Sequence, residues 1–261
     1  MTPADNDFTL QPMTQAELNE IIRKHHMFRT AKPGGARAVV RDRDLSGLNF
    51  TGQDLSQSDF TGCIMYGATL SNASFESATL FGCDLRSANM RGTRLVRADL
   101  RGADVDGADL HKADLTGADL REGKTIVKRK VKREEDQYSK AAEAGVVQFT
   151  ASDMTEAVLQ GATAINADFT DARMENSDLG SANLKGAVLR GADLTGSSLK
   201  DADLRDADFS YATMTGADMK GAEKAGSTFT LTLTADTVGK DIEEFELTLD
   251  EMVLKHIEWV A

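Results

Sequence analysis

The residues best suited to chemistry in this chain are its carboxylates, which recur at a fixed spacing. Residues 97–120 read RADLRGADVDGADLHKADLTGADL, so that an Ala-Asp pair returns about every five residues. Two carboxylates held close together can act as a general acid and a general base. An Asp-rich wall would offer many such pairs, but the regular spacing selects none of them. The pattern therefore indicates a structural repeat rather than one catalytic site.

The other candidates for catalysis or metal binding are four histidines and two cysteines. None of the histidines has a spacing to cysteine that is typical of a metal site: His25, His26, His111 and His256. We expect His25 and His256 to pack or to cap a helix. Cys63 and Cys83 are 20 residues apart and are predicted to stack as small buried side chains. The sequence therefore predicts no enzymatic activity, no cofactor and no metal.

The elements that position these residues must have a period of five. An apolar residue recurs at every fifth place from Val40 to Leu120 and, with Ala164 as its weakest member, from Phe149 to Met219; the residue two places earlier is usually small. Helices repeat every 3.6 residues and strands every two, so neither fits. A chain that turns a corner every five residues closes a square coil in 20, and such coils stack about 4.8 Å apart. Steps of 20 then align Phe149, Phe169, Leu189 and Phe209.

These repeats resemble a known family. ADLTGADL at 113–120 and ANLKGAVLRGADLTG at 182–196 resemble the A(D/N)LXX pattern of pentapeptide-repeat proteins, and the resemblance covers about 38–122 and 147–222. It implies an all-β solenoid, a right-handed quadrilateral β-helix with the apolar and small residues inward. The family, many of whose members are bacterial, includes proteins that bind DNA gyrase as mimics of acidic duplex DNA. Fold alone does not fix function.

We expect helical terminal segments and a mid-solenoid insertion. Thr14 and Glu17 form a candidate capping box for a helix over 14–30. Phe229, Leu231 and Leu233 alternate as in a strand. The predicted divisions are an N-terminal segment with a capping helix, a first repeat run, a basic insertion, a second repeat run, and a C-terminal strand and helix, at 1–37, 38–122, 123–148, 149–222 and 223–261.

One helical motif occurs twice. The pattern L-x-E-h-h-x-K-H-x-x-(F/W) runs from Leu18 to Phe28 and again from Leu249 to Trp259. The first copy leads into the repeats. The second copy has two interpretations: it is the start of a further repeat domain, or it is a C-terminal cap that resembles the first.

The charge of the chain restricts its partners. A net charge of −12 opposes general binding to nucleic acid or to a membrane surface. The insertion at 123–148 differs, with seven basic and four acidic residues, and is either a solvated loop or a nucleic-acid contact. We see neither a signal peptide nor an apolar run of the roughly 18 residues that a membrane span needs. We therefore expect a cytoplasmic protein that does not enter membranes.

Three apolar residues fall at outward places that should be polar, namely Ile64, Tyr66 and Phe81. They are either covered by the insertion or the N-terminal segment, or they contact a protein partner or a second copy of the chain. The first run has a net charge of −4, and residues 149–222 have −6. We therefore predict a non-enzymatic protein-interaction scaffold with an unknown protein partner. The alternative is a DNA mimic that binds DNA gyrase or another DNA-binding protein.

Overall fold

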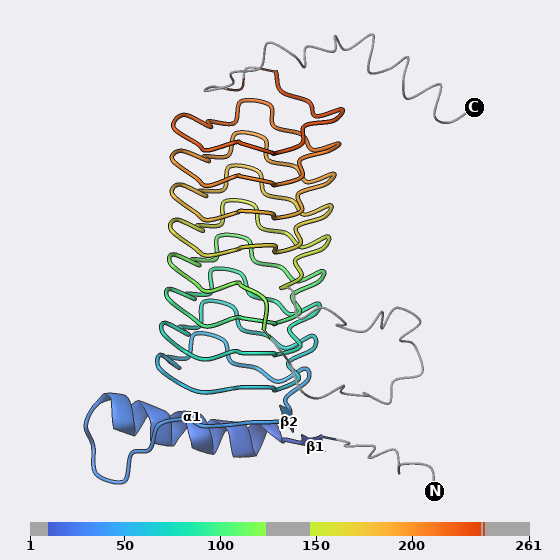
Figure 1. Cartoon of the computed structure of the whole chain (residues 1–261). Helices are drawn as coiled ribbons and strands as arrows, with labels where there is room; N and C mark the ends of the chain where they lie inside the picture. The colour runs from blue at the N-terminus through green and yellow to red at the C-terminus, as the bar shows by residue number, and fades with distance from the viewer. Residues whose placement is uncertain (1–9, 124–146, 236, 238–261) are drawn as a thin grey trace, which may run out of the picture.

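The chain folds into a stack of square coils on one short helix (Figure 1). The structure is a computed structural model that describes residues 10–123, 147–235 and 237. Its regular elements are β1 (Gln11–Pro12), α1 (Gln15–Arg29) and β2 (Arg43–Asp44), and β1 pairs with β2 in parallel. Within these described ranges, no helix is long and apolar enough to cross a membrane.

Backbone hydrogen bonds between successive coils hold the stack together. The N–H of Leu45 donates to the carbonyl of Ile64 at 2.7 Å, and the N–H of Ile64 donates to the carbonyl of Arg43 at 3.0 Å. The same pattern recurs at every fifth residue, so that within each run a bridged residue meets the one 20 places later. Four such columns run along the stack as four walls. The predicted 20-residue coil is therefore confirmed.

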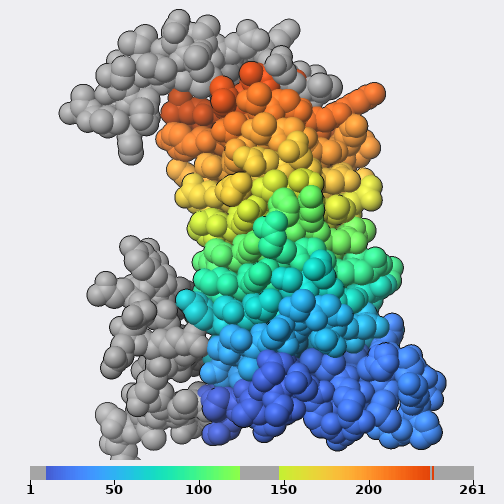
Figure 2. Space-filling model, turned by 180° about the vertical axis from the view of Figure 1, so that it is seen from behind, coloured from blue at the N-terminus to red at the C-terminus, as the bar shows by residue number. Residues whose placement is uncertain are grey.

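The two repeat runs form one solenoid. Asp104 bridges Gln148 and Asp119 bridges Thr163, 44 residues apart instead of 20, and the spacing of 20 then resumes. Figure 2 shows the coils from behind as one column. Val147 is fully buried and Gln148 is bridged on both sides. These two residues therefore belong to the coil, and the second run begins before residue 149.

The core consists of ladders of like residues. Leu189 is completely buried, and so are its predicted neighbours Phe169 and Phe209. The rings of Phe149 and Phe169 stack with their centroids 4.9 Å apart. Cys63 and Cys83 are buried, and each thiol donates to the backbone carbonyl of an inward residue: Cys63 to Val40 at 3.3 Å and Cys83 to Phe60 at 3.0 Å.

The recurrent Asp stabilises the corners. The side chain of Asp114 accepts the N–H of Thr116 at 3.0 Å, and that of Asp193 accepts the N–H of Thr195 at 3.0 Å. Such turns are the usual use of Asp and Asn outside helices. The second corner residue has positive φ, as at Gly191 with 67°, which favours glycine. The Asp at each such corner is thus explained by backbone geometry, without catalysis.

The strand expected after residue 222 is not formed. Phe229, Leu231 and Leu233 alternate in sequence, but they belong to one more coil. Phe229 points inward, Leu231 stands at a corner and Leu233 is a bridged residue. Leu231 has a corner φ of 55°. Three bridges join this coil to the preceding one: Asp203↔Glu223, Asp208↔Thr228 and Thr213↔Leu233. The five-residue period thus continues through this segment, and the alternation of apolar residues does not reflect a strand. The C-terminal helix expected beyond it lies outside the described residues.

The N-terminal segment covers the first coil. The capping box predicted from Thr14 and Glu17 is present at the start of α1. The side-chain amide of Gln15 donates to the carbonyl of Asn49 at 2.9 Å and accepts its N–H at 2.9 Å. It thereby replaces a neighbouring backbone at an edge that would otherwise be open. Leu18 of α1 is fully buried in the core.

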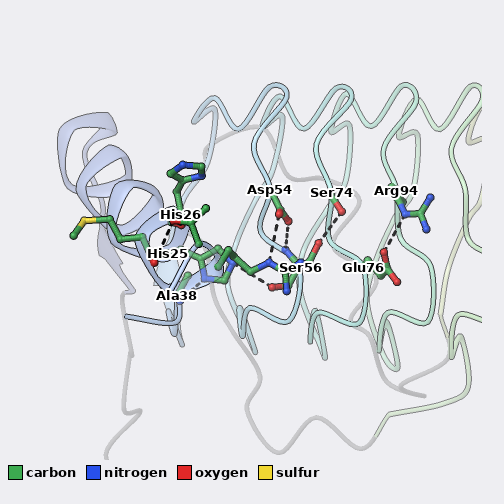
Figure 3. A network of polar contacts seen from close by, with 11 residues as sticks. His25, His26, Ala38, Asp54, Ser56, Ser74, Glu76 and Arg94 are labelled. Carbon is green, nitrogen blue, oxygen red and sulfur yellow. Dashed lines mark hydrogen bonds and ion pairs between the residues drawn. The ribbon is translucent and has the colours of Figure 1, made fainter. Parts of the chain in front are cut away.

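His25 locks α1 onto this coil (Figure 3). Its ring is fully buried. Nδ1 accepts the N–H of Ala38 at 3.0 Å, so Nε2, 3.1 Å from the carbonyl of Ser56, carries the proton. Burial lowers the pKa of His25, while the Ser56 carbonyl and Asp54 act against that shift. The neutral ring is therefore the form that fits.

We expect acid to loosen this cap. Because the folded protein resists protonating His25 while the unfolded chain does not, the stability it contributes is present above about pH 6.5 and is lost as the pH falls. Hydrogen exchange of the α1 amides should be faster at pH 5 than at pH 7.5 after correction for intrinsic rates. His25→Leu should remove this pH dependence and cost about 1–3 kcal/mol. His26→Gln, at the exposed neighbour, is the matched control; equal protection of α1 at both pH values would contradict the role of His25.

Candidate functional site

The described residues contain no cluster of three or more histidine, cysteine or acidic side chains that could hold a metal ion. A shallow cavity of about 290 Å³ lies beside α1, lined by Gln15, Asn19, Asn49, Thr51 and Gln53. These side chains are amides and a hydroxyl, so the cavity holds no group that could act as an acid or base near neutral pH. The walls of the solenoid are the remaining candidates for a functional surface.

One wall differs from the other three. We call it the Asp104 wall, and its bridged residues are Asp44, Ile64, Asp84, Asp104, Gln148, Asp168, Val188, Asp208 and Thr228. The corner places along its two edges carry every outward Tyr and Phe of the described coils. Tyr66 and Tyr211 follow bridged residues on one edge, and Phe81 precedes one on the other.

The structure places the three predicted contact residues on this wall but does not expose all of them. Ile64, at a bridged place of this wall, is only 3 % exposed. Its prediction as an exposed contact is wrong. Tyr66 and Phe81, at the corners, keep partial exposure. The guanidinium of Arg86 lies 5.7 Å from the Tyr66 ring centroid, and that of Arg101 lies 5.4 Å from the Phe81 centroid.

These arginines also belong to an ion-pair ladder. Arg86 contacts Asp84 at 2.8 Å and Asp104, on the next coil, at 3.6 Å. Arg101 repeats the arrangement with Asp99 at 2.8 Å and Asp119 at 3.6 Å. A basic corner residue thus meets an acid 18 places later, and the same spacing recurs in Arg91–Asp109, Arg190–Asp208, Lys200–Asp218 and Arg205–Glu223. The arginines that interrupt the acidic walls are therefore paired with them.

Carboxylates crowd the middle of the Asp104 wall. Burial, followed by the charge of Asp106, raises the pKa of Asp104 to about 7. Burial also raises the pKa of Asp106, although its carboxylate accepts the N–H of Thr150 at 3.0 Å. Gln148 occupies a bridged place where most coils have Asp or Asn. The Thr150 N–H therefore donates to Asp106 of the preceding coil instead of to a side chain at position 148. Both acids therefore lie where the first run meets the second, since Asp104 bridges Gln148 and Asp106 binds the Thr150 N–H.

Tyr211 was missed by the sequence reasoning. Its side chain is 54 % exposed, and the guanidinium of Arg190 lies 5.8 Å from its ring centroid. Three further apolar side chains lie on the same wall or its edges, at Ile165, Val188 and Leu231. The sequence contained a signal for it. Tyr211 lies 20 residues after Gly191, so a tyrosine occupies a corner place that the preceding coil fills with glycine.

The geometry defines a β-helix solenoid built from five-residue units. The profile of the family Pentapeptide repeats matches eight copies over residues 44–82, 83–121, 147–180 and 182–221. The chain belongs to the pentapeptide-repeat family. No curated protein matches its sequence.

Several solved structures are similar. HetL, a pentapeptide repeat protein involved in heterocyst differentiation regulation in the cyanobacterium Nostoc sp. strain PCC 7120, is 24 % identical, with 82 % of this chain and 93 % of HetL covered at a TM-score of 0.64. A pentapeptide repeat protein of the Arabidopsis thaliana thylakoid lumen is 32 % identical over 41 % of this chain and 73 % of its own, at 0.34. QnrB1, a plasmid-mediated fluoroquinolone resistance protein, is 19 % identical over 73 % and 92 %, at 0.38. The likeness to HetL shows the right-handed β-helix fold alone.

We expect neutralising Asp104 to stabilise the protein at high pH. Because its pKa is raised, the folded protein keeps a proton that the unfolded chain loses above about pH 4; the associated stability is present below that pH and lost as the pH rises through 7. Asp104→Asn should raise the unfolding free energy by about 1 kcal/mol at pH 8 and change it little at pH 4. Urea denaturation measures both values.

The matched control is Asp114→Asn, which changes the same bridged place on a different wall and should not stabilise at pH 8. Asn can accept the corner N–H as Asp does, as Asn49 shows with Thr51. A larger gain from Asp104→Asn at pH 4 than at pH 8 would contradict the assignment.

Proposed function

We propose that this protein is a non-enzymatic interaction scaffold whose protein partner docks on the Asp104 wall. The observation that carries the proposal is the confinement of Tyr66, Phe81 and Tyr211 to the edges of that wall, each with an arginine over its ring. Tyrosine and arginine are enriched among the residues that dominate binding energy at protein interfaces. The ladder of hydrogen bonds holds these side chains on a rigid surface, which lowers the entropic cost of binding.

The other polar side chains support a structural rather than a catalytic role. At most corners a carboxylate or amide already accepts a backbone N–H, as Asp178 does from Gly180 at 2.9 Å. Several carboxylates also pair with a basic residue of the neighbouring coil, as Asp218 does with Lys200 at 3.1 Å. Groups engaged in this way are held in place by the fold. They are poorly suited to exchange protons with a substrate.

The DNA-mimic alternative has one observation in its favour. Within the described part of the chain, five acids of the second run take part in no ion pair: Asp168, Asp171, Asp178, Asp193 and Asp201. They lie on more than one wall, however, and Arg173, Arg190 and Arg205 stand among them. A mimic of duplex DNA needs a long continuous negative face. We therefore rank this function second.

A capture experiment separates the two functions. Immobilised protein is exposed to a lysate of cells that express it, and retained proteins are quantified at 50 and 500 mM salt. Tyr66→Ala with Phe81→Ala should lower retention of the main partner at least about fivefold, a loss of more than about 1 kcal/mol, with little dependence on salt. Gln160→Ala with Ser198→Ala, on the opposite wall, is the control and should bind as wild type.

The scaffold proposal fails if the wall variant retains the partner as well as the control does. If 500 mM salt abolishes retention and the wild-type protein alters the rate of supercoiling by DNA gyrase, the DNA-mimic function replaces it, because contacts between charged surfaces weaken as salt screens them.

A further inference from the structure

Tyr211 occupies a backbone place that the fold would fill more easily with glycine. Its φ is 65°, and the same corner place carries Gly67, Gly107 and Gly191 in other coils. A bulky residue with positive φ is a conformational outlier. The ring gains little burial in return, since it is 54 % exposed. The packing of the coils therefore does not explain why a tyrosine stands here.

The apolar residues around Tyr211 form a diagonal across the Asp104 wall. Ile165 stands at the corner before Asp168, Val188 lies on the wall one coil later, and Tyr211 stands at the opposite corner one coil later again. Leu231 occupies the corner place of the next coil, directly beyond Tyr211 in its column. Each step rises by one coil, about 4.8 Å. The diagonal gives an apolar strip with Tyr211 as its exposed member.

The charge beside this strip is negative. Arg190, which covers the Tyr211 ring, is compensated by Asp208 at 3.7 Å. Asp171 stands two coils below Tyr211 in the same column, and Asp193 lies on the neighbouring wall. Neither acid takes part in an ion pair within the described ranges. Because the whole chain has a net charge of −12, a second copy would be repelled, whereas a basic segment would be attracted.

We propose that the strip of Ile165, Val188, Tyr211 and Leu231, which we call the Tyr211 strip, binds a polypeptide segment that carries an apolar side chain and a Lys or Arg about 10 Å away. The apolar side chain packs on Tyr211, and the cation reaches Asp171. This inference rests on the proposed scaffold function and specifies its partner by chemistry.

Synthetic peptides test it directly. The probe is a fluorescein-labelled 12-residue peptide with one Trp and two Lys at the third and fourth places after it, since three extended residues span about 10 Å. One analogue replaces Trp by Ala, and another replaces both Lys by Glu. Anisotropy titrations use the full chain as wild type, as Tyr211→Gly, as Asp171→Asn and as Ser181→Gly. The last is a control for the same backbone change at a corner of the opposite wall, where φ is 55°.

We expect the Trp–Lys peptide to bind wild type and Ser181→Gly equally, and Tyr211→Gly at least tenfold more weakly. The Tm of Tyr211→Gly should be equal to or above that of wild type, since glycine adopts this φ freely. Asp171→Asn should weaken binding and reduce its salt dependence.

Four results overturn the proposal. Equal affinity of the peptide for wild type and Tyr211→Gly would show that Tyr211 does not anchor the partner. The proposed scaffold function would not be affected, because the capture experiment tests it separately. Absence of binding by the Trp–Lys peptide, or tighter binding of the Glu analogue, excludes the basic partner. Sedimentation of wild type as a dimer that Tyr211→Gly dissociates assigns the strip to a second copy instead.

Discussion

The structure depends on one constraint: the backbone of each coil must form hydrogen bonds with the backbone of the next coil, so that equivalent residues, 20 places apart within a run, lie side by side. The bond from the Val40 N–H to the Asp59 carbonyl is the first of a long series of this kind. With this register, inward residues stack on inward residues, corner residues on corner residues, and bridged residues on bridged residues of the next coil. Each buried Leu, Met or Phe then contributes about 1.5–3 kcal/mol through burial, and no coil is stable without its neighbours.

The same register divides the side chains by task. Inward residues form the core, and the Asp or Asn that precedes most of the large inward residues stabilises the corner. Only the remaining outward places are free to vary, and it is there that Tyr66, Phe81 and Tyr211 are found. Their grouping along one wall spans the insertion, because the 44-residue step from Asp104 to Gln148 returns the second run to the same wall. A slip of five residues would turn every wall of the second half by one corner and separate Tyr211 from Tyr66.

Much of this fold could be predicted from the sequence, because a five-residue period admits few backbones. The ladder through Leu189 and the capping box at Thr14 followed from the residues themselves. The burial of Ile64 could not be predicted from the sequence, because the exposure of a residue at the middle of a wall depends on side chains contributed by two other coils. The last coil was missed because Phe229, Leu231 and Leu233 fit a strand and a coil equally well. The pairing of Arg86 with Asp104 required knowing that residues 18 apart become neighbours.

The most direct test of the account is the register across the insertion. Asp114→Cys is combined in turn with Val158→Cys, Asp153→Cys and Thr163→Cys, and disulfide formation under mild oxidation is measured. Asp114 bridges Val158, whereas Asp153 and Thr163 lie on the two adjacent walls, beyond the reach of a disulfide. We predict rapid cross-linking of the Asp114–Val158 pair alone. Preferential cross-linking of either other pair would show that the second run is rotated, and that no single wall unites the aromatic residues.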